Sequence, residues 1–296
     1  MSLSNVLIVG AGPAGLTATL QLKRYGVECI VFEKTRPGGL LNNANLVENY
    51  PGFPGGIPGP ALVALFERQI QAVGAGVTHA EVLSLDYSEG KFQLTTQTGK
   101  YEAAIVVVAS GTRPRRFTQL DIPEAVQSRV HYEIYPLLQL EGKRIAIVGA
   151  GDAAFDYALN LGKKNDVTIL NRSETVKCLP LLWERAQAAQ GIHYYSNTAV
   201  LGVLEHPQDG LLVAHTSTQG DALLEADYLI GALGREACLD FISPRLLAGA
   251  EELQKQGVLY FIGDVKNKLY RQTAIAVGDG LLAAMKIFET LRNRSV

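Results

Sequence analysis

The chain has 296 residues, of which 47% are hydrophobic, and a formal net charge of −2. This length predicts two domains of ordinary size. The charge gives no basic surface of the kind that binds nucleic acid, and the longest apolar runs, such as IVVVA at 105–109, are too short to cross a bilayer. The N-terminus lacks the basic start and long apolar core of a signal peptide, so we expect a cytoplasmic protein.

One pattern occurs twice along the chain. An apolar strand, a glycine-rich turn, a helix and a second strand follow one another at 5–34 and again at 144–172, and a hairpin pattern follows each copy at 91–111 and 210–234. This order predicts two Rossmann-like α/β domains of three layers each. A strand at 258–264 and a helix at 272–291 lie beyond both copies, and we assign them to the first domain. The second domain, 115–243, is then inserted in the first, 1–114 and 244–296.

The first glycine turn, GAGPAG, is typical of a dinucleotide site. Gly10 allows the tight turn, Gly12 lets a pyrophosphate approach the backbone, and Gly15 lets the helix pack on the strand. The helix N-terminus offers N–H groups to the phosphates. Glu33 ends the next strand, where an acid takes the ribose hydroxyls.

Five further segments follow in order: PGGLL (37–41), VENYPGFPG (47–55), VVVASG (106–111), FIGDV (261–265) and YRQTAIAVGDGLLAA (270–284). With them the chain resembles the low-molecular-weight thioredoxin reductase flavoproteins over nearly its whole length. The resemblance implies FAD in the first domain, a nicotinamide nucleotide in the second, and a homodimer formed through the FAD domains. The FAD-binding residues that it implies are Gly10, Gly12, Pro13, Ala14, Gly15, Glu33, Lys34, Gly39, Leu40, Asn49, Val82, Ala109, Gly111, Asp264, Arg271, Gln272 and Thr273.

The second glycine turn, GAGDAA, lacks some of the acidic and basic residues that accompany such a turn in a nucleotide site. The residues that it offers to a nucleotide are Gly149, Gly151, Asp152, Ala153 and Ala154. The following strand ends before Asn171 rather than before an acid, so recognition of a ribose diol is not supported. The resemblance implies a His-Arg-Arg run and a further Arg for NADPH, but the matching segment is NRSETVK, in which only Arg172 and Lys177 are cations.

Loss of one guanidinium contact weakens NADPH binding by roughly ten- to a hundredfold. The ligand of the second site therefore stays open among NADPH, a second FAD, which does not need the cations for the 2′-phosphate, and none.

The redox disulfide of the resembling reductases is missing. Counted back from Gly149, their CxxC falls on Tyr132 and Tyr135, and the three cysteines, Cys29, Cys178 and Cys238, have neither CxxC nor metal-ligand spacing. Tyrosine cannot form the mixed disulfide of thiol exchange. We therefore expect no ordinary thioredoxin reductase activity unless Cys178 or Cys238 has been recruited, and we expect no metal site. Tyr132 and Tyr135 are candidates for contact with the flavin or for filling the space between domains, and the catalytic residues stay unassigned.

The sequence favours an FAD-dependent oxidoreductase that moves electrons between a dinucleotide and an acceptor other than thioredoxin. Three alternatives stay open. One is a two-flavin electron-transfer protein, and another is a non-catalytic FAD-binding sensor or interaction protein. The third is a ferredoxin–NADP reductase of thioredoxin-reductase type. Those enzymes also lack CxxC and resemble the chain through 130–161, but they carry a C-terminal extension and the full arginine run.

Overall fold

The computed structural model describes residues 6–294, and the chain divides into two compact units. The first unit contains 6–42, 47–113 and 236–294, and the second contains 43–46 and 114–235. The return to the first unit thus comes at 235/236 rather than at the expected 243/244. Leu239, Phe241 and Ile242 explain the difference, because they pack into the core of the first unit.

The short segment 43–46 belongs to the second unit because its polar groups are bonded there. The N–H groups of Ile134 and Tyr135 both donate to Asn43 Oδ1, at 3.1 and 2.9 Å. The N–H of Asn45 donates to Asp156 Oδ2 at 3.0 Å. No sequence pattern indicated that 43–46 belongs to the second unit, since this depends on single hydrogen bonds between residues about a hundred positions apart.

The first unit is built on a five-stranded parallel sheet in the order β18-β7-β1-β2-β3. The strands are β1 (Val6–Val9), β2 (Cys29–Glu33), β3 (Val77–His79), β7 (Ile105–Val108) and β18 (Leu259–Phe261). The central strands VLIV and IVVV are buried throughout, as expected for a parallel sheet that is covered on both faces. Because β18 pairs with β7, the C-terminal segment forms part of the sheet of the first unit.

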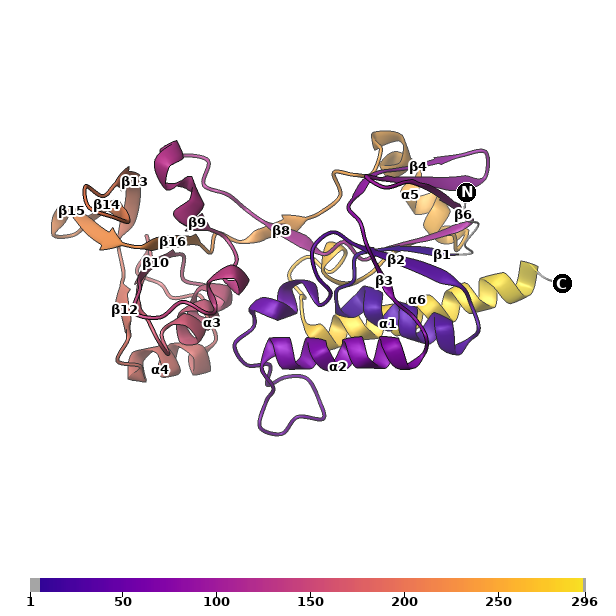
Figure 1. Cartoon of the computed structure of the whole chain (residues 1–296), viewed down its shortest axis with the longest axis horizontal. Coiled ribbons are helices and arrows are strands. Elements are labelled where there is room, and N and C mark those ends of the chain that lie inside the picture. Colours follow the sequence, from indigo (N-terminus) through magenta and orange to yellow (C-terminus); the bar gives the residue numbers. More distant parts are fainter. Residues whose placement is uncertain (1–5, 295–296) are drawn as a thin grey trace. The chain divides into compact units, whose positions relative to one another are not determined.

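Helices cover one face of this sheet and a second small sheet covers the other (Figure 1). The helices are α1 (Pro13–Arg24), α2 (Gly59–Ala72) and α6 (Thr273–Arg294). A Cβ at Gly280 of α6 would lie 2.4 Å from the backbone O of Ala14, so only glycine permits α6 to pack so closely on α1. The opposite layer consists of β4 (Val82–Ser88), β5 (Lys91–Thr96), β6 (Lys100–Ala103) and α5 (Pro244–Lys255). Their buried Leu85, Phe92 and Leu246 share a core with Leu7.

The second unit repeats the plan, with the parallel order β12-β11-β10-β16-β9. The strands are β9 (Val130–His131), β10 (Arg144–Val148), β11 (Asp166–Leu170), β12 (Ile192–Tyr195) and β16 (Tyr228–Gly231). The helices α3 (Asp152–Leu161) and α4 (Pro180–Ala188) form one core with the sheet, in which Trp183 packs edge-on against Phe155. The sheet of β13 (Ala199–Glu205), β14 (Leu211–Ser217) and β15 (Gly220–Ala226) contributes to the other core.

The predicted fold class is confirmed, and each predicted hairpin gains one unpredicted strand. β4 precedes the first hairpin and β13 the second, and each begins with a register irregularity, at Val82/Ser84 and Val200/Gly202. A bulge interrupts the alternation of apolar and polar residues by which a strand is recognised in sequence. The unit boundaries fall in β8 (Thr112–Pro114) and β17 (Arg235–Ala237), which pair with each other. Over residues 6–294, no helix is long and apolar enough to span a membrane.

Candidate nucleotide-binding sites

The predicted residues of the first site gather at the carboxyl edge of the first sheet. Gly10 follows β1, Glu33 ends β2, Ala109 follows β7, and Asp264 lies in the short 3-10 helix η4 (Gly263–Val265) just after β18. Carboxyl ends of parallel strands meet at one edge, which is where open α/β sheets bind their ligands. Gly10 has φ +102°, and a Cβ there would lie 2.4 Å from the backbone O of Ala109, so the turn requires glycine.

Gly12 leaves an open cradle at the start of α1. Its φ is −72°, which any residue adopts, and a Cβ built there meets no atom within 4 Å. No side chain caps the helix, whose first residues are Pro13, Ala14 and Gly15. A space that a Cβ would fill, in front of an uncapped helix N-terminus, fits the pyrophosphate of a dinucleotide.

The Glu33 carboxylate is fixed beside this cradle. Its Oε2 accepts the N–H of Ala11 at 3.0 Å, and its Oε1 accepts the N–H and the hydroxyl of Thr35. A carboxylate can accept about four hydrogen bonds, so one position is left for a ribose hydroxyl. The neighbouring Lys34 forms an exposed pair with Glu81 at 3.9 Å, one residue before Val82 begins β4.

Two segments far apart in sequence meet at the other end of the first site. Asn49 Nδ2 donates to Gln272 Oε1 at 2.7 Å, across 223 residues. Arg271 and Gln272 directly precede α6, and Thr273 is its first residue. The resemblance implied both Asn49 and the start of α6, and the fold brings them into direct contact.

Gly39 and Leu40 lie in the 3-10 helix η1 (Gly39–Asn43). A Cβ at Gly39 would lie 3.6 Å from the Cα of Gly12, so this helix borders the cradle. The buried Asn42 fixes it, because its Nδ2 donates to the carbonyls of Pro37 and Gly39. Sequence reasoning missed Asn42. Its signal was a polar residue shortly after the glycine pair at 38–39, which is weak. Gly111 has φ +64°, and a Cβ built there would meet no atom within 4 Å.

Asp279, in α6, is a second residue that sequence reasoning missed. Its Oδ2 accepts the N–H of Gly263 at 3.0 Å and a bond from Asn267, and Lys266 pairs with its Oδ1. Burial alone would raise the pKa of this carboxyl, but these donors outweigh burial and lower its pKa. Asp279 thereby holds the turn that carries Asp264. An acid between two glycines in an apolar helix was the available signal.

The second glycine turn reproduces the geometry of the first. Gly149 has φ +130°, and a Cβ there would lie 2.4 Å from the backbone O of Ala232. A Cβ at Gly151 meets nothing within 4 Å, and no side chain caps α3. Ala154 is buried against the sheet, whereas Ala153 is exposed. The cradle therefore fits a dinucleotide pyrophosphate as the first one does.

The segment after β11 closes on this second turn. The N–H of Lys177 donates to the backbone O of Ala150 at 2.9 Å, and the N–H of Leu179 donates to Asp152 Oδ1 at 2.8 Å. The Asp152 side chain, which sequence analysis offered to a nucleotide, is thus engaged by the chain itself. Arg172 and Lys177 are both exposed.

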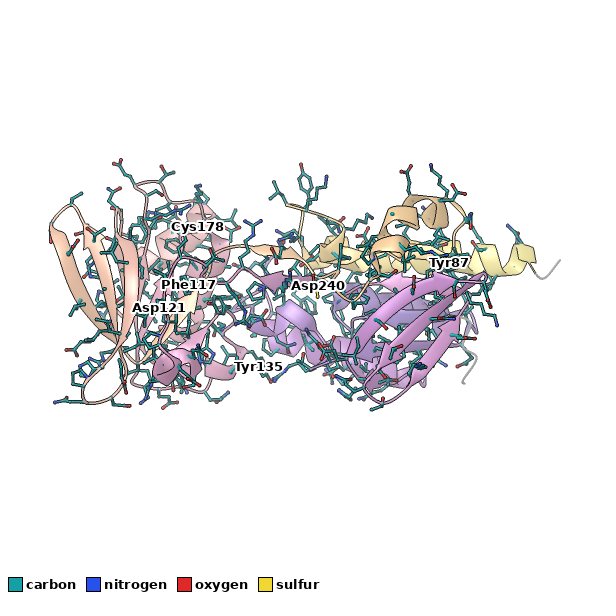
Figure 2. The ribbon with its side chains drawn as sticks, turned by 90° about the horizontal axis from the view of Figure 1, so that it is seen from above. Tyr87, Phe117, Asp121, Tyr135, Cys178 and Asp240 are labelled. Atoms are coloured by element: carbon teal, nitrogen blue, oxygen red, sulfur yellow. The ribbon has the colours of Figure 1, made fainter. Side chains whose placement is uncertain are left out.

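Tyr132 and Tyr135 are both part of the second unit; Figure 2 labels Tyr135 there, together with Phe117. The Tyr132 hydroxyl accepts the N–H of Phe117 at 3.2 Å, and its ring lies beside the Phe117 ring and under the Arg116 guanidinium. A Cβ at Gly231 would lie 2.8 Å from its ring, so Gly231 makes room for it. Tyr132 therefore has a packing role within its own unit.

All three cysteines are free thiols. Burial raises the pKa of Cys29 to about 11 and also raises that of Cys178. No cluster of metal-ligating side chains occurs among the described residues.

Comparison with known proteins identifies the family. The profile of the pyridine nucleotide-disulphide oxidoreductase family matches residues 4–280. The chain belongs to this family. It is 30% identical to NADPH-dependent thioredoxin reductase 3 of Arabidopsis thaliana, over 96% of its own length and 57% of that protein. It is also 30% identical to the thioredoxin reductase of Streptomyces clavuligerus, over 95% of its own length and 92% of that protein.

The fold also matches solved structures of thioredoxin reductases. The Lactococcus lactis enzyme superposes with a TM-score of 0.85 at 22% identity, covering 98% of this chain and 99% of the other. The protein is therefore a thioredoxin reductase-like flavoprotein with two Rossmann-like nucleotide-binding domains.

Proposed function

We propose that the protein is an FAD-dependent oxidoreductase that takes electrons from a nicotinamide dinucleotide and passes them to an acceptor other than thioredoxin. One combination of residues supports this proposal. The first nucleotide cradle keeps its glycines and Glu33, whereas a count back from Gly149 assigns the disulfide positions of the resembling reductases to Tyr132 and Tyr135.

FAD is the ligand proposed for the first unit. Gly12 and the N-terminus of α1 would hold its pyrophosphate, and Glu33 would hold the adenosine ribose. Asp264 would take a ribityl hydroxyl, and the start of α6 would stabilise negative charge on the reduced ring through the helix dipole. Bound there, FAD supplies the capacity to accept a hydride from a reduced nicotinamide and to deliver two electrons onward.

The second unit would bind the nicotinamide dinucleotide. The open position at Gly151 and the uncapped start of α3 fit a pyrophosphate, and Arg172 and Lys177 offer positive charge to a 2′-phosphate. This supports NADPH as the donor over a second FAD, which carries no 2′-phosphate to attract these cations.

Electrons would leave the flavin without a protein dithiol. Exchange requires a thiolate attacking a disulfide. Burial raises the pKa of both Cys29 and Cys178, which disfavours their thiolates at neutral pH. Neither cysteine has a partner thiol within four positions. A direct acceptor, either a small molecule or a protein-bound redox group, suits this arrangement.

We also propose a homodimer formed through the first unit. The exposed face of α6 carries Ile275, Leu282 and Met285, each 40–50% exposed, at positions that lie on one side of the helix. A large apolar side of an exposed helix is typical of a protein contact. Sedimentation of the purified chain tests this proposal, and a monomer at micromolar concentration would refute it.

Cofactor extraction and anaerobic reduction test the function. We expect one FAD per chain, bleaching of the flavin absorbance by NADPH, and no reduction of thioredoxin when NADPH and thioredoxin are both supplied. Two flavins per chain would identify a two-flavin carrier instead. A flavin that neither NADPH nor NADH bleaches would refute the proposed donor and favour a non-catalytic role.

A further inference from the structure

Asn171, at the carboxyl end of β11, is the most completely bonded polar side chain near the second cradle. It is 5% exposed. Its Nδ2 donates to the backbone O of Thr175 at 3.1 Å and to the hydroxyl of Tyr194 at 2.9 Å. Its Oδ1 accepts the N–H and the hydroxyl of Ser173, at 3.1 and 3.2 Å. Both donors and both acceptor positions of the amide are therefore used within the protein.

The backbone of Asn171 is equally engaged. Its N–H donates to the O of Tyr195, and its O accepts the N–H of Thr198 at 2.8 Å. The N–H of Asn197 donates to the O of Ser173. The amide thus closes the loop 171–175 on itself, and the backbone ties this loop to the segment that follows β12.

This loop lies directly beside the glycine turn. The N–H of Gly149 donates to the O of Leu170 at 3.0 Å, one residue before the loop begins. At the far end, the N–H of Lys177 donates to the O of Ala150. Both ends are fixed against the cradle, so the backbone between them has a defined path past it.

Arg172 is the cation on the fixed part of the loop. It is exposed, and no ion pair to it occurs within residues 6–294. The single proton of the Ser173 hydroxyl is shared between Asn171 Oδ1 and the O of Thr175, and Glu174 is an acid. Within 171–175 only Arg172 therefore offers a charged donor to an incoming phosphate.

We propose that Asn171 is a positioning residue for recognition of the 2′-phosphate of the dinucleotide. It contacts no ligand itself. Its amide holds the loop in one conformation, so that Arg172 meets the phosphate without first ordering the backbone, and pre-ordering of this kind increases affinity. This inference rests on the proposed use of a nicotinamide dinucleotide by the second unit. It assigns a role to the position where an acid for the ribose diol is absent.

The chain supplies a matched control at the opposite end of the same strand. Asn165 directly precedes β11, is 8% exposed, and is similarly bonded. Its Nδ2 donates to the carbonyls of Leu140 and Leu161, and its Oδ1 accepts the N–H of Lys143. Asn165→Ala removes a comparable buried amide from the same unit while leaving the loop 171–175 intact.

The experiment compares binding of 2′,5′-ADP and ADP to the full flavin-loaded chain by calorimetry. We expect the wild type to bind 2′,5′-ADP about tenfold more tightly than ADP, since one charge-assisted bond is worth about that factor. Asn171→Ala should lose most of this preference while binding ADP as before. Arg172→Ala should lose it too, and the double variant should lose no more than either. Asn165→Ala should keep the preference even if its melting temperature falls.

Tyr194→Phe is a milder test, because it removes only the hydroxyl that accepts from Asn171, and it should reduce the preference about two- to threefold. Retention of the full preference by Asn171→Ala, or an equal loss in Asn165→Ala, would overturn the positioning role alone. A wild type that binds ADP but shows no preference would overturn it together with the choice of NADPH as donor, and would leave nucleotide binding by the second unit standing. A wild type that binds neither ligand would remove the proposed nucleotide site as well.

Discussion

Substitution of Gly12 by alanine should change the free energy of unfolding very little and FAD affinity strongly. The backbone at Gly12, with φ −72° and ψ −178°, is open to any residue, and the added Cβ meets no atom within 4 Å. Alanine reduces the entropy of the unfolded chain but is a poorer N-cap than glycine. The free energy of unfolding of the FAD-free chain should therefore change by less than about 1 kcal/mol.

Binding of FAD should respond very differently. The new methyl group occupies the space assigned to the pyrophosphate, and forcing one methyl into a filled site costs about 1–3 kcal/mol. FAD affinity should therefore fall by about 5- to 150-fold. The measurements are a thermal melt of the FAD-free protein and a titration with FAD that follows quenching of flavin fluorescence.

Gly151→Ala provides the matched comparison in the second unit. Its backbone, with φ −95° and ψ −179°, and its open Cβ position are equivalent. This variant should retain FAD but lose reduction by NADPH. If Gly12→Ala binds FAD with wild-type affinity, the pyrophosphate does not lie at Gly12 and the assignment of the first site is wrong.

Substitutions at three further positions, Asp156, Glu33 and Asp279, test other groups of the two units. Burial raises the pKa of Asp156 to about 6, while the N–H of Asn45 only partly opposes it. Because the folded state then binds the proton more tightly than the unfolded state, stability should fall as pH rises from about 4 to about 6. Asp156→Asn should abolish this dependence of stability on pH. Above about pH 6 it should raise the free energy of unfolding, measured in urea, by up to about 3 kcal/mol. An unchanged dependence on pH would contradict the reasoning. Glu33→Ala should weaken FAD binding by roughly ten- to a hundredfold in the same fluorescence titration, and unchanged occupancy would argue against its ribose role. Asp279→Ala leaves the N–H of Gly263 without its acceptor and should destabilise the FAD-free chain by about 1–3 kcal/mol, whereas Asp279→Asn, which keeps an acceptor, should recover part of that loss in thermal melts.

Regular features of the sequence predicted most of the fold. The two glycine turns, the apolar strands VLIV and IVVV, and the long final helix all gave strong local signals, and the structure forms each of them. The strands β4 and β13 gave weaker signals because each begins with an irregular register. The chain returns to the first unit at 236 rather than at the expected 244, because the packing of Phe241 into the first core is a tertiary contact without a local pattern.

In the candidate sites, the sequence indicated the glycines with backbone roles but not the side chains that support them. Residues with backbone roles, such as Gly10 and Gly149, can be recognised because a positive φ and a close carbonyl leave no alternative to glycine. Supporting side chains such as Asn42 and Asp279 were missed, since their importance lies in which backbone groups happen to face them. Tyr132 was singled out by counting from the glycine turn, but its contacts with Phe117 and Gly231 had no signal in the sequence.

The sequence by itself determined the two Rossmann-like cores, the glycine cradles and the absence of a CxxC pair, because each depends on residue type and spacing along the chain. Only the tertiary structure decided the fate of individual polar groups. In the structure, the Asn171 amide is hydrogen-bonded to Ser173, Thr175 and Tyr194. The sequence showed only that this position has no acid. The physical reason is that a buried amide must satisfy every donor and acceptor, and the partners that do so are set by the packing of segments that are distant in sequence.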